Sequence, residues 1–164
     1  MTKGNIRNHN KDFEFILENI ATELHPFIYD HHKTWNLMSQ VRKSNVQQIY
    51  NKALEVIAHE IQHHFKQEED LILTRLKRYV NNQVVGPIAK LIDEHRSIEK
   101  KYHEVQKSYH QNPESLEFKK QINLLAYIIM KHIEKEDHYF YPLVSLILSQ
   151  EEKAEISALF HILR

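Results

Sequence analysis

The chain contains no cysteine, and this absence excludes several kinds of site. Disulfides, zinc fingers, thiolate-bound iron–sulfur clusters and cysteine nucleophiles all require a cysteine sulfur. A bound metal would therefore be held by nitrogen and oxygen atoms. Net charge is absent too, because 22 Lys and Arg residues balance 22 Asp and Glu residues. Since the protein has no overall field to attract nucleic acid or anionic lipid, we expect neither a nucleic-acid nor a membrane partner.

Long apolar runs are also missing. No stretch reaches the roughly 18 to 20 apolar residues of a membrane helix, and residues 1–11 are polar, without the apolar core of a signal peptide. We therefore expect a cytoplasmic protein. Its 164 residues, of which 41% are hydrophobic, suffice to bury one core. We predict a polar tail over residues 1–11 and a single domain over residues 12–164.

Glycine and proline are scarce, with two and four residues respectively. Long segments without turn dipeptides favour long helices with short connections, and apolar residues recur at three- and four-residue steps. We therefore predict an all-α fold, an up-down-up-down four-helix bundle with a short C-terminal fifth helix. The predicted helices run from residue 11 or 12 to 43, from 44 to 81–82, from the Gly86-Pro87 turn to 111–113, from there through 143, and over 150–163.

Two details of the predicted helices depend on single residues. Pro26 falls inside the first helix, and proline is tolerated in a first turn but costly in an interior. Either Pro26 kinks this helix or the bundle helix begins there. Ser149 and Glu152 have the spacing of a capping box, which predicts the start of the fifth helix. Ser44 is the expected N-cap of the second helix.

Each of the four long predicted helices carries one histidine on its apolar stripe. These histidines are His31, His64, His95 and His132. An unpaired buried histidine costs roughly 1 to 3 kcal/mol, so each must be hydrogen-bonded or bound to a metal. In the second and fourth helices a glutamate follows four residues later, at Glu68 and Glu136. Because positions i and i+4 share a helix face, each pair aims an imidazole and a carboxylate at one point.

This combination predicts a dinuclear metal centre inside the bundle. A single inward histidine is more commonly a hydrogen-bonded core residue, but four on four stripes with two matched carboxylates favour metal binding. About four imidazoles and two carboxylates suit iron, with manganese and zinc as alternatives. Glu68 and Glu136 would bridge the two ions, since they are shared between facing helices. Open coordination positions would remain for an exogenous ligand.

The strings that carry these residues also resemble a known family. They are His31-His32-Lys33-Thr34-Trp35, His64-x-x-x-Glu68-Glu69, Asp93-Glu94-His95-Arg96, and His132-x-x-x-Glu136-Asp137 leading into Tyr141-Pro142. Together, over about residues 17–163, they resemble the hemerythrin-like (HHE cation-binding) domain. The resemblance implies a non-heme di-iron centre with two iron ions. It implies imidazole ligands and carboxylate bridges at the positions of the four histidines and two glutamates named above.

Three ligand positions have alternatives. Oxygen-carrying hemerythrins have a second histidine four residues after the third-helix ligand, where this chain has Glu99. Glu99 either ligates as a carboxylate or leaves that position to water. His32 is the alternative to His31. Asp137 is the alternative to Glu136, because the carriers place this carboxylate one residue later.

Other polar residues near these stripes are weaker candidates for a role at the metal centre. His59 and His63 lie at i and i+4 on a stripe roughly 100° from His64, and we interpret them as outer-layer or solvated residues. Tyr102, one heptad after His95, could donate a hydrogen bond to a ligand on the metal. A core tyrosine with a satisfied hydroxyl is the commoner case.

Three classes of function fit this sequence. The first is a di-iron protein that binds dioxygen, nitric oxide or iron for sensing, storage or buffering, and we favour it. The second is a stress-response iron donor or repair factor for iron–sulfur centres, although the cysteine-bearing segment and the additional histidine of those relatives are missing. The third is a di-iron oxidase or peroxidase. No phosphate loop or nucleophile–base pair is visible, which weighs against an enzyme. The sequence names no protein partner.

Overall fold

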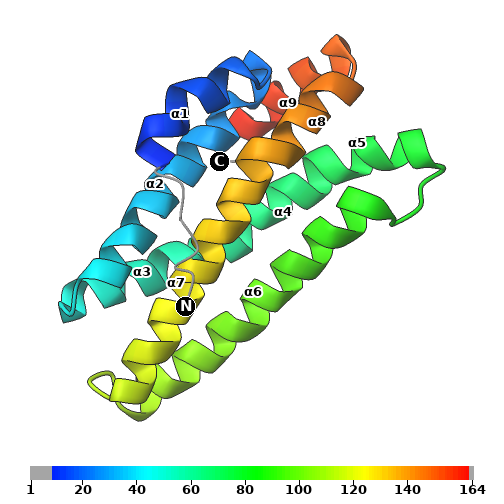
Figure 1. Cartoon of the computed structure of the whole chain (residues 1–164). Coiled ribbons are helices and arrows are strands. Elements are labelled where there is room, and N and C mark those ends of the chain that lie inside the picture. Colours follow the sequence, from blue (N-terminus) through cyan, green and yellow to red (C-terminus); the bar gives the residue numbers. More distant parts are fainter. Residues whose placement is uncertain (1–8, 163–164) are drawn as a thin grey trace.

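A computed structural model describes residues 9–162 of the chain (Figure 1). Every regular element in this range is helical and no strand occurs between its ends. The predicted all-α fold class is thus confirmed. No helix within the same range is long and apolar enough to cross a membrane.

The helical structure is interrupted ahead of the first long helix. Helix α1 spans His9–Glu18, a 3₁₀ turn η1 spans Thr22–Leu24, and α2 spans His25–Lys43. Pro26 lies in the first turn of α2, where its missing N–H removes no helical hydrogen bond. The second alternative for Pro26 is therefore the observed one, and one continuous helix from residue 11 or 12 to 43 is wrong. The start of α1 also falls inside the segment predicted as a tail.

The second helical rod is continuous but changes its winding. It comprises α3 (Gln47–His59), the π-helix η2 (Glu60–His64), α4 (Phe65–Gln67), the π-helix η3 (Glu68–Leu73), α5 (Thr74–Lys77) and the 3₁₀ turn η4 (Arg78–Val80). Its N-cap is Val46, and Ser44 instead accepts a hydrogen bond from the Val46 N–H at 3.1 Å. Asn81 and Asn82 end the rod with left-handed φ values of 54° and 58°, a conformation that asparagine tolerates.

The third and fourth rods are long and begin at well-defined signals. Helix α6 spans Gly86–Gln111 and starts from the left-handed φ of +54° that glycine allows at residue 86. Helix α7 spans Leu116–Lys135, and the Ser115 hydroxyl caps it by accepting a hydrogen bond from the Phe118 N–H. The same rod continues through the π-helix η5 (Glu136–Phe140) into α8 (Tyr141–Ile147).

The final helix closes one end of the molecule. Helix α9 spans Gln150–Ile162, and residue 163 of the predicted range lies outside the described residues. Ser149 and Glu152 bond reciprocally at 3.1 Å, side chain to backbone N–H in both directions, so the capping box is confirmed. Ile156 and Phe160 are buried, and α9 packs against η1 and η3. Helices α1 and α9 both lie near α8 at this end (Figure 1).

The long rods lie side by side, with α2 against α3 and α7, and α6 against α7 and α3 (Figure 1). Their buried apolar residues form two clusters. On α2, Ile28 belongs to one cluster and Trp35 to the other. On α6, Leu91 and Ile98 are divided in the same way. The histidine of each helix falls between them, so a polar layer separates two apolar halves of the core.

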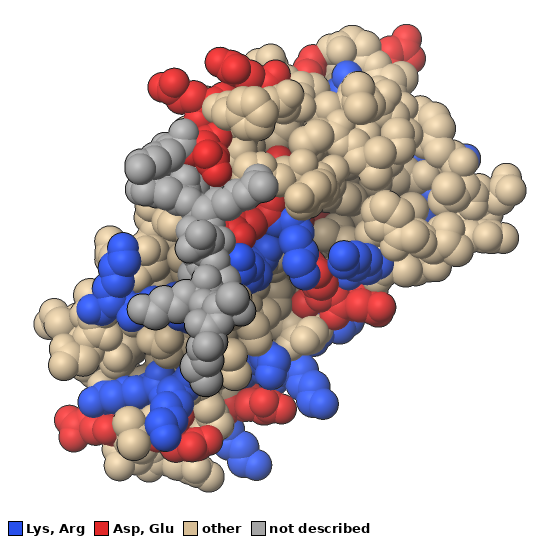
Figure 2. Space-filling view, viewed as in Figure 1, with Lys and Arg blue, Asp and Glu red and all other residues tan. Residues whose placement is uncertain are grey.

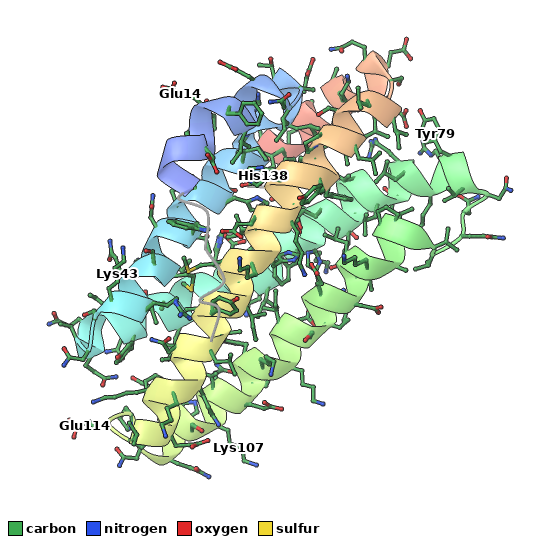
Figure 3. All side chains as sticks on the ribbon, viewed as in Figure 1. Glu14, Lys43, Tyr79, Lys107, Glu114 and His138 are labelled. Atoms are coloured by element: carbon green, nitrogen blue, oxygen red, sulfur yellow. The ribbon has the colours of Figure 1, made fainter. Side chains whose placement is uncertain are left out.

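Side chains of both charges appear on the face drawn in Figure 2. Lysine and arginine side chains alternate with aspartate and glutamate side chains over the lower part of this face (Figure 2). This mixture agrees with the balanced composition of the chain. In Figure 3, Lys43, Lys107 and Glu114 mark one end of the rods and Tyr79 marks the opposite end.

Candidate metal centre

The polar layer brings together histidines and glutamates from all four long rods. It contains His31 of α2, His64 of η2, Glu68 of η3, His95 of α6, His132 of α7 and Glu136 of η5. None of the six is more than 4% exposed. Side chains that end in nitrogen and oxygen gather between α4, α6 and α7 in Figure 3. Six of the seven residues predicted as metal ligands thus meet inside the molecule.

These six residues form two groups that share both glutamates. One group is His31, His64, Glu68 and Glu136, and the other is Glu68, His95, His132 and Glu136. Within each group, one ligand atom from every residue lies within 4.8 Å of the others. Each group could hold one metal ion, with two imidazoles and two carboxylates around it.

Each carboxylate divides its two oxygens between the groups. Oε1 of Glu68 is 2.8 Å from Nε2 of His64, while Oε2 is 3.0 Å from Nε2 of His95. Likewise, Oε2 of Glu136 is 3.0 Å from Nε2 of His31 and Oε1 is 2.6 Å from Nε2 of His132. A carboxylate placed in this way can bridge two ions with one oxygen on each.

Several of these buried atoms have no hydrogen bond. Among the described residues, no partner exists for Nε2 of His95 and His132, Oε2 of Glu68, or either oxygen of Glu136. They approach other polar atoms closely, but the angles do not suit hydrogen bonds. An unsatisfied buried polar group costs about 1 to 3 kcal/mol, so the protein alone leaves this layer poorly satisfied. A cation between the converging lone pairs would satisfy these atoms, and the donor set therefore fits a metal.

Carboxylates outside the layer orient three of the four rings. The Nδ1–H of His31 donates to Asp137 Oδ1 at 2.6 Å. On the other side, His95 Nδ1 donates to Glu69 at 3.0 Å and His132 Nδ1 donates to Glu94 at 2.8 Å. With the proton on Nδ1, the Nε2 lone pair points inward, as a metal ligand requires. Asp137 therefore orients a ring, and Glu136 is the residue placed among the ligands.

A tyrosine hydroxyl completes the layer. Tyr141, which is fully buried, donates a hydrogen bond to Glu68 Oε1 at 2.7 Å. Burial and the nearby charges of Glu68 and Glu136 hold the pKa of Tyr141 well above its usual value, so its hydroxyl stays a donor. From the sequence, Tyr102 was a possible donor of this kind, but a core tyrosine with a satisfied hydroxyl was the commoner case. Tyr102 lies instead in the apolar cluster, where its hydroxyl accepts a hydrogen bond from Gln106.

The rods widen where they carry these groups. The π-helix η2 ends at His64, η3 begins at Glu68 and η5 begins at Glu136. Each π turn adds a residue to the helical turn and so shifts which side chains face inward. This shift places Tyr141, five residues after Glu136, beside the same layer. Helical wheels drawn with the α period could not have found it.

Opposite charges within the layer shift one another's pKa values. Burial alone would lower the pKa of His64, but the charges of Glu60 and Glu68 outweigh it and raise that pKa to about 10. Burial and the Glu68 charge would raise the pKa of Glu136, yet His132 and His31 lower it to about 2. Glu136 is therefore ionised, and His64 holds its ring protons at neutral pH. A metal cation competes with these protons for the same lone pairs.

Two predicted candidates lie outside the layer. Glu99 accepts a hydrogen bond from the Arg96 guanidinium at the surface, and its side chain is 26% exposed. Although it lies one helical turn after His95, its carboxylate belongs to neither ligand group. His32 stacks on Phe13 with ring centroids 4.1 Å apart, so His31 is the histidine that faces inward.

The family model for the hemerythrin HHE cation-binding domain matches residues 22–144. The chain belongs to the hemerythrin HHE cation-binding family. All six converging residues of this hemerythrin-like chain lie inside the matched range. No curated protein and no solved structure gives a significant match to it.

Proposed function

We propose that this hemerythrin-like chain holds two iron ions and binds dioxygen or nitric oxide for sensing, storage or buffering. The pair of ligand groups that share Glu68 and Glu136 carries the proposal. His31 and His64 would hold one ion, and His95 and His132 the other. When bound, iron would supply redox chemistry and open coordination positions, which four protein ligands per ion leave available. Manganese and zinc are the competing metals.

The protein groups around the centre have separate roles in this proposal. The outer carboxylates Asp137, Glu69 and Glu94 hold three imidazoles with Nε2 inward. The Tyr141 hydroxyl holds Glu68 in place and keeps a proton on its own oxygen. Two apolar clusters exclude water from both sides of the layer. Together these groups preorganise the ligands, since neither the rings nor the carboxylates can rotate freely.

A cavity supports access by a small ligand. It measures about 430 Å³, lies between the start of α6 and η5, and has Glu136 in its wall. Leu91, Phe140 and Leu143 make much of its lining apolar. An apolar path that ends at a proposed bridging residue suits small uncharged molecules such as dioxygen and nitric oxide.

We also propose that the long rods form the up-down-up-down bundle predicted from the sequence. The packing of α2 on α3 and α7, and of α6 on α7 and α3, supports this arrangement. Lys43 ends α2 and Lys107 lies near the end of α6, and both occupy the same end of the molecule (Figure 3).

A second candidate function is an iron donor, for example to damaged iron–sulfur centres. It is favoured by another cavity, which has His64, a residue of the first ligand group, in its wall. Restoration of a damaged iron–sulfur enzyme by the iron-loaded protein, beyond that by free iron, would select this function.

The decisive experiment measures iron and absorption together. Protein produced with iron should contain about two iron ions per chain. Exposure of the reduced protein to dioxygen or nitric oxide should produce a ligand-to-metal charge-transfer band. The double variant His64→Ala, Glu68→Ala should lose both the iron and the band.

A matched control is the double variant His103→Ala, Glu104→Ala, which removes the same residue types from the exposed side of α6. It should keep both ions. Full iron content in the His64/Glu68 variant would refute the ligand assignment. Two bound ions without any response to either gas would refute the sensing and storage function and leave the donor function.

A further inference from the structure

The cavity at His64 differs from the one at Glu136 in its chemistry. It measures about 420 Å³ and lies between α2 and the run from α3 to α4. Asp30 and Thr34 of α2 and Glu60 of η2 line it together with His64. Because His64 also belongs to the first ligand group, this cavity reaches one residue of the proposed metal centre.

Two exposed histidines flank this cavity. His59, the last residue of α3, and His63 in η2 both line it, within the run His59-Glu60-Ile61-Gln62-His63. Their ring centroids are 4.5 Å apart and the rings are inclined by 36°. Two histidines at i and i+4 on one helical face have the spacing that chelates a divalent cation. Imidazole nitrogens suit zinc, copper, nickel and iron.

Two carboxylates also line this cavity, next to the ring of His64. Asp30 Oδ2 is 3.8 Å and Glu60 Oε2 is 3.9 Å from Nδ1 of His64. The Thr34 hydroxyl donates to Glu60 Oε1 at 2.6 Å, which fixes this carboxylate and leaves Oε2 toward the ring. Both oxygens could accompany a cation on its way from the surface to the centre.

The ring of His64 is exceptional among the four inner histidines. The other three donate Nδ1–H to a carboxylate at 2.6 to 3.0 Å. Nδ1 of His64 makes no hydrogen bond to any residue in 9–162, although the residue is only 3% exposed. Gaps of 3.8 and 3.9 Å to two carboxylates exceed hydrogen-bonding distance. The inner end of the cavity thus presents an unpaired polar atom and two carboxylate oxygens around one space.

We propose that His59 and His63 form an external divalent-cation site, at which iron binds first before it passes Asp30 and Glu60 to the centre. Delivery to the centre rests on the proposed function, whereas the external site stands without it. Lys33 also lines the cavity and repels a cation. The two carboxylates outweigh this single positive charge.

The external site is tested on the protein as purified, with its iron in place. Calorimetric titration with zinc should reveal about one further ion per chain, bound by the i, i+4 pair. The variant His59→Ala, His63→Ala should lose this ion and keep its iron. The control His103→Ala, His110→Ala removes two exposed histidines elsewhere and should bind zinc as the wild type does. Equal zinc binding by the His59/His63 variant would overturn the proposal, as would no additional zinc in the wild type.

Delivery is tested by the rate of loading. Metal-free protein is mixed with limiting ferrous iron in the absence of oxygen, and incorporation is followed by quenching with a chelator. Removal of both external histidines should slow loading about tenfold, because the pair raises the local cation concentration. The final iron content should not change.

Equal loading rates in wild type and variant would overturn the delivery step. Zinc binding at His59 and His63 in a protein that never takes up interior iron would refute the proposed function and support the external site. The two failures are therefore distinguishable, and circular dichroism verifies that both variants retain their helices.

Discussion

Asp137 offers a sharp test of how the metal centre is organised, because the sequence left it as the alternative to Glu136. In the structure, its carboxylate accepts the Nδ1–H of His31 at 2.6 Å, and the two side chains are 0% and 2% exposed. The substitution Asp137→Asn keeps the shape and one acceptor oxygen but removes the charge. We expect weaker metal binding with an unchanged number of ions.

The magnitude follows from this one hydrogen bond. A bond to a charged acceptor contributes about 1.5 to 3 kcal/mol and one between neutral groups about 0.5 to 1.5 kcal/mol. The difference, about 1 to 1.5 kcal/mol, corresponds to roughly a tenfold change in affinity. An asparagine that turns its amide N–H₂ toward His31 would lose the bond completely. Replacement of such outer residues typically weakens metal binding about 10- to 100-fold, which sets the expected range.

The assay is a competition titration of ferrous iron or cobalt against a chelator of known affinity, without oxygen. Asp70→Asn is the matched control, because it makes the same change at an exposed residue two positions after Glu68. An affinity within about twofold of wild type would refute the orienting role. Loss of an ion at saturating metal would show that Asp137 is itself a ligand and that Glu136 was assigned wrongly.

Three further predictions follow from other parts of the structure. Glu99→Gln should leave the number of bound ions and their affinity unchanged in the same titration, because Glu99 accepts a hydrogen bond from Arg96 at the surface. Loss of an ion in this variant would show that Glu99 is a ligand. Ser115→Ala should lower the free energy of unfolding by about 0.5 to 2 kcal/mol in urea, since it removes the N-cap of α7, and an unchanged midpoint would contradict that role. Metal binding should release protons and strengthen as the pH rises through neutrality. Neighbouring carboxylates outweigh burial and raise the pKa of His64 to about 10 and that of His95 to about 11. A cation must therefore displace protons from these rings. Calorimetry in buffers of different ionisation enthalpy counts them, and a count of zero would refute this protonation state.

Much of the fold could be predicted from the sequence because its signals are local. The spacing of apolar residues marks one face of a helix, and the same spacing placed His95 and His132 on the buried stripes of α6 and α7. Capping residues act within four positions, so the start of α9 at Ser149 and Glu152 was also predictable. The start of a new helix at Pro26 was predicted only as one of two alternatives, since the sequence alone does not distinguish a proline in a first turn from one that kinks a helix.

The surroundings of the ligands depended on tertiary structure. His31 and Asp137 are 106 residues apart in the chain, and Tyr141 and Glu68 are 73 apart. No local pattern records such pairings, because they arise only when rods pack in a particular register. The π turns at Glu68 and Glu136 are likewise decided by packing, which compensates for the less favourable backbone winding. The sequence by itself determined that one histidine of each long rod turns inward, through the helical period and the cost of burying polar groups. Tertiary packing decided which atoms then meet, because rotation and register of whole rods set the distances between them.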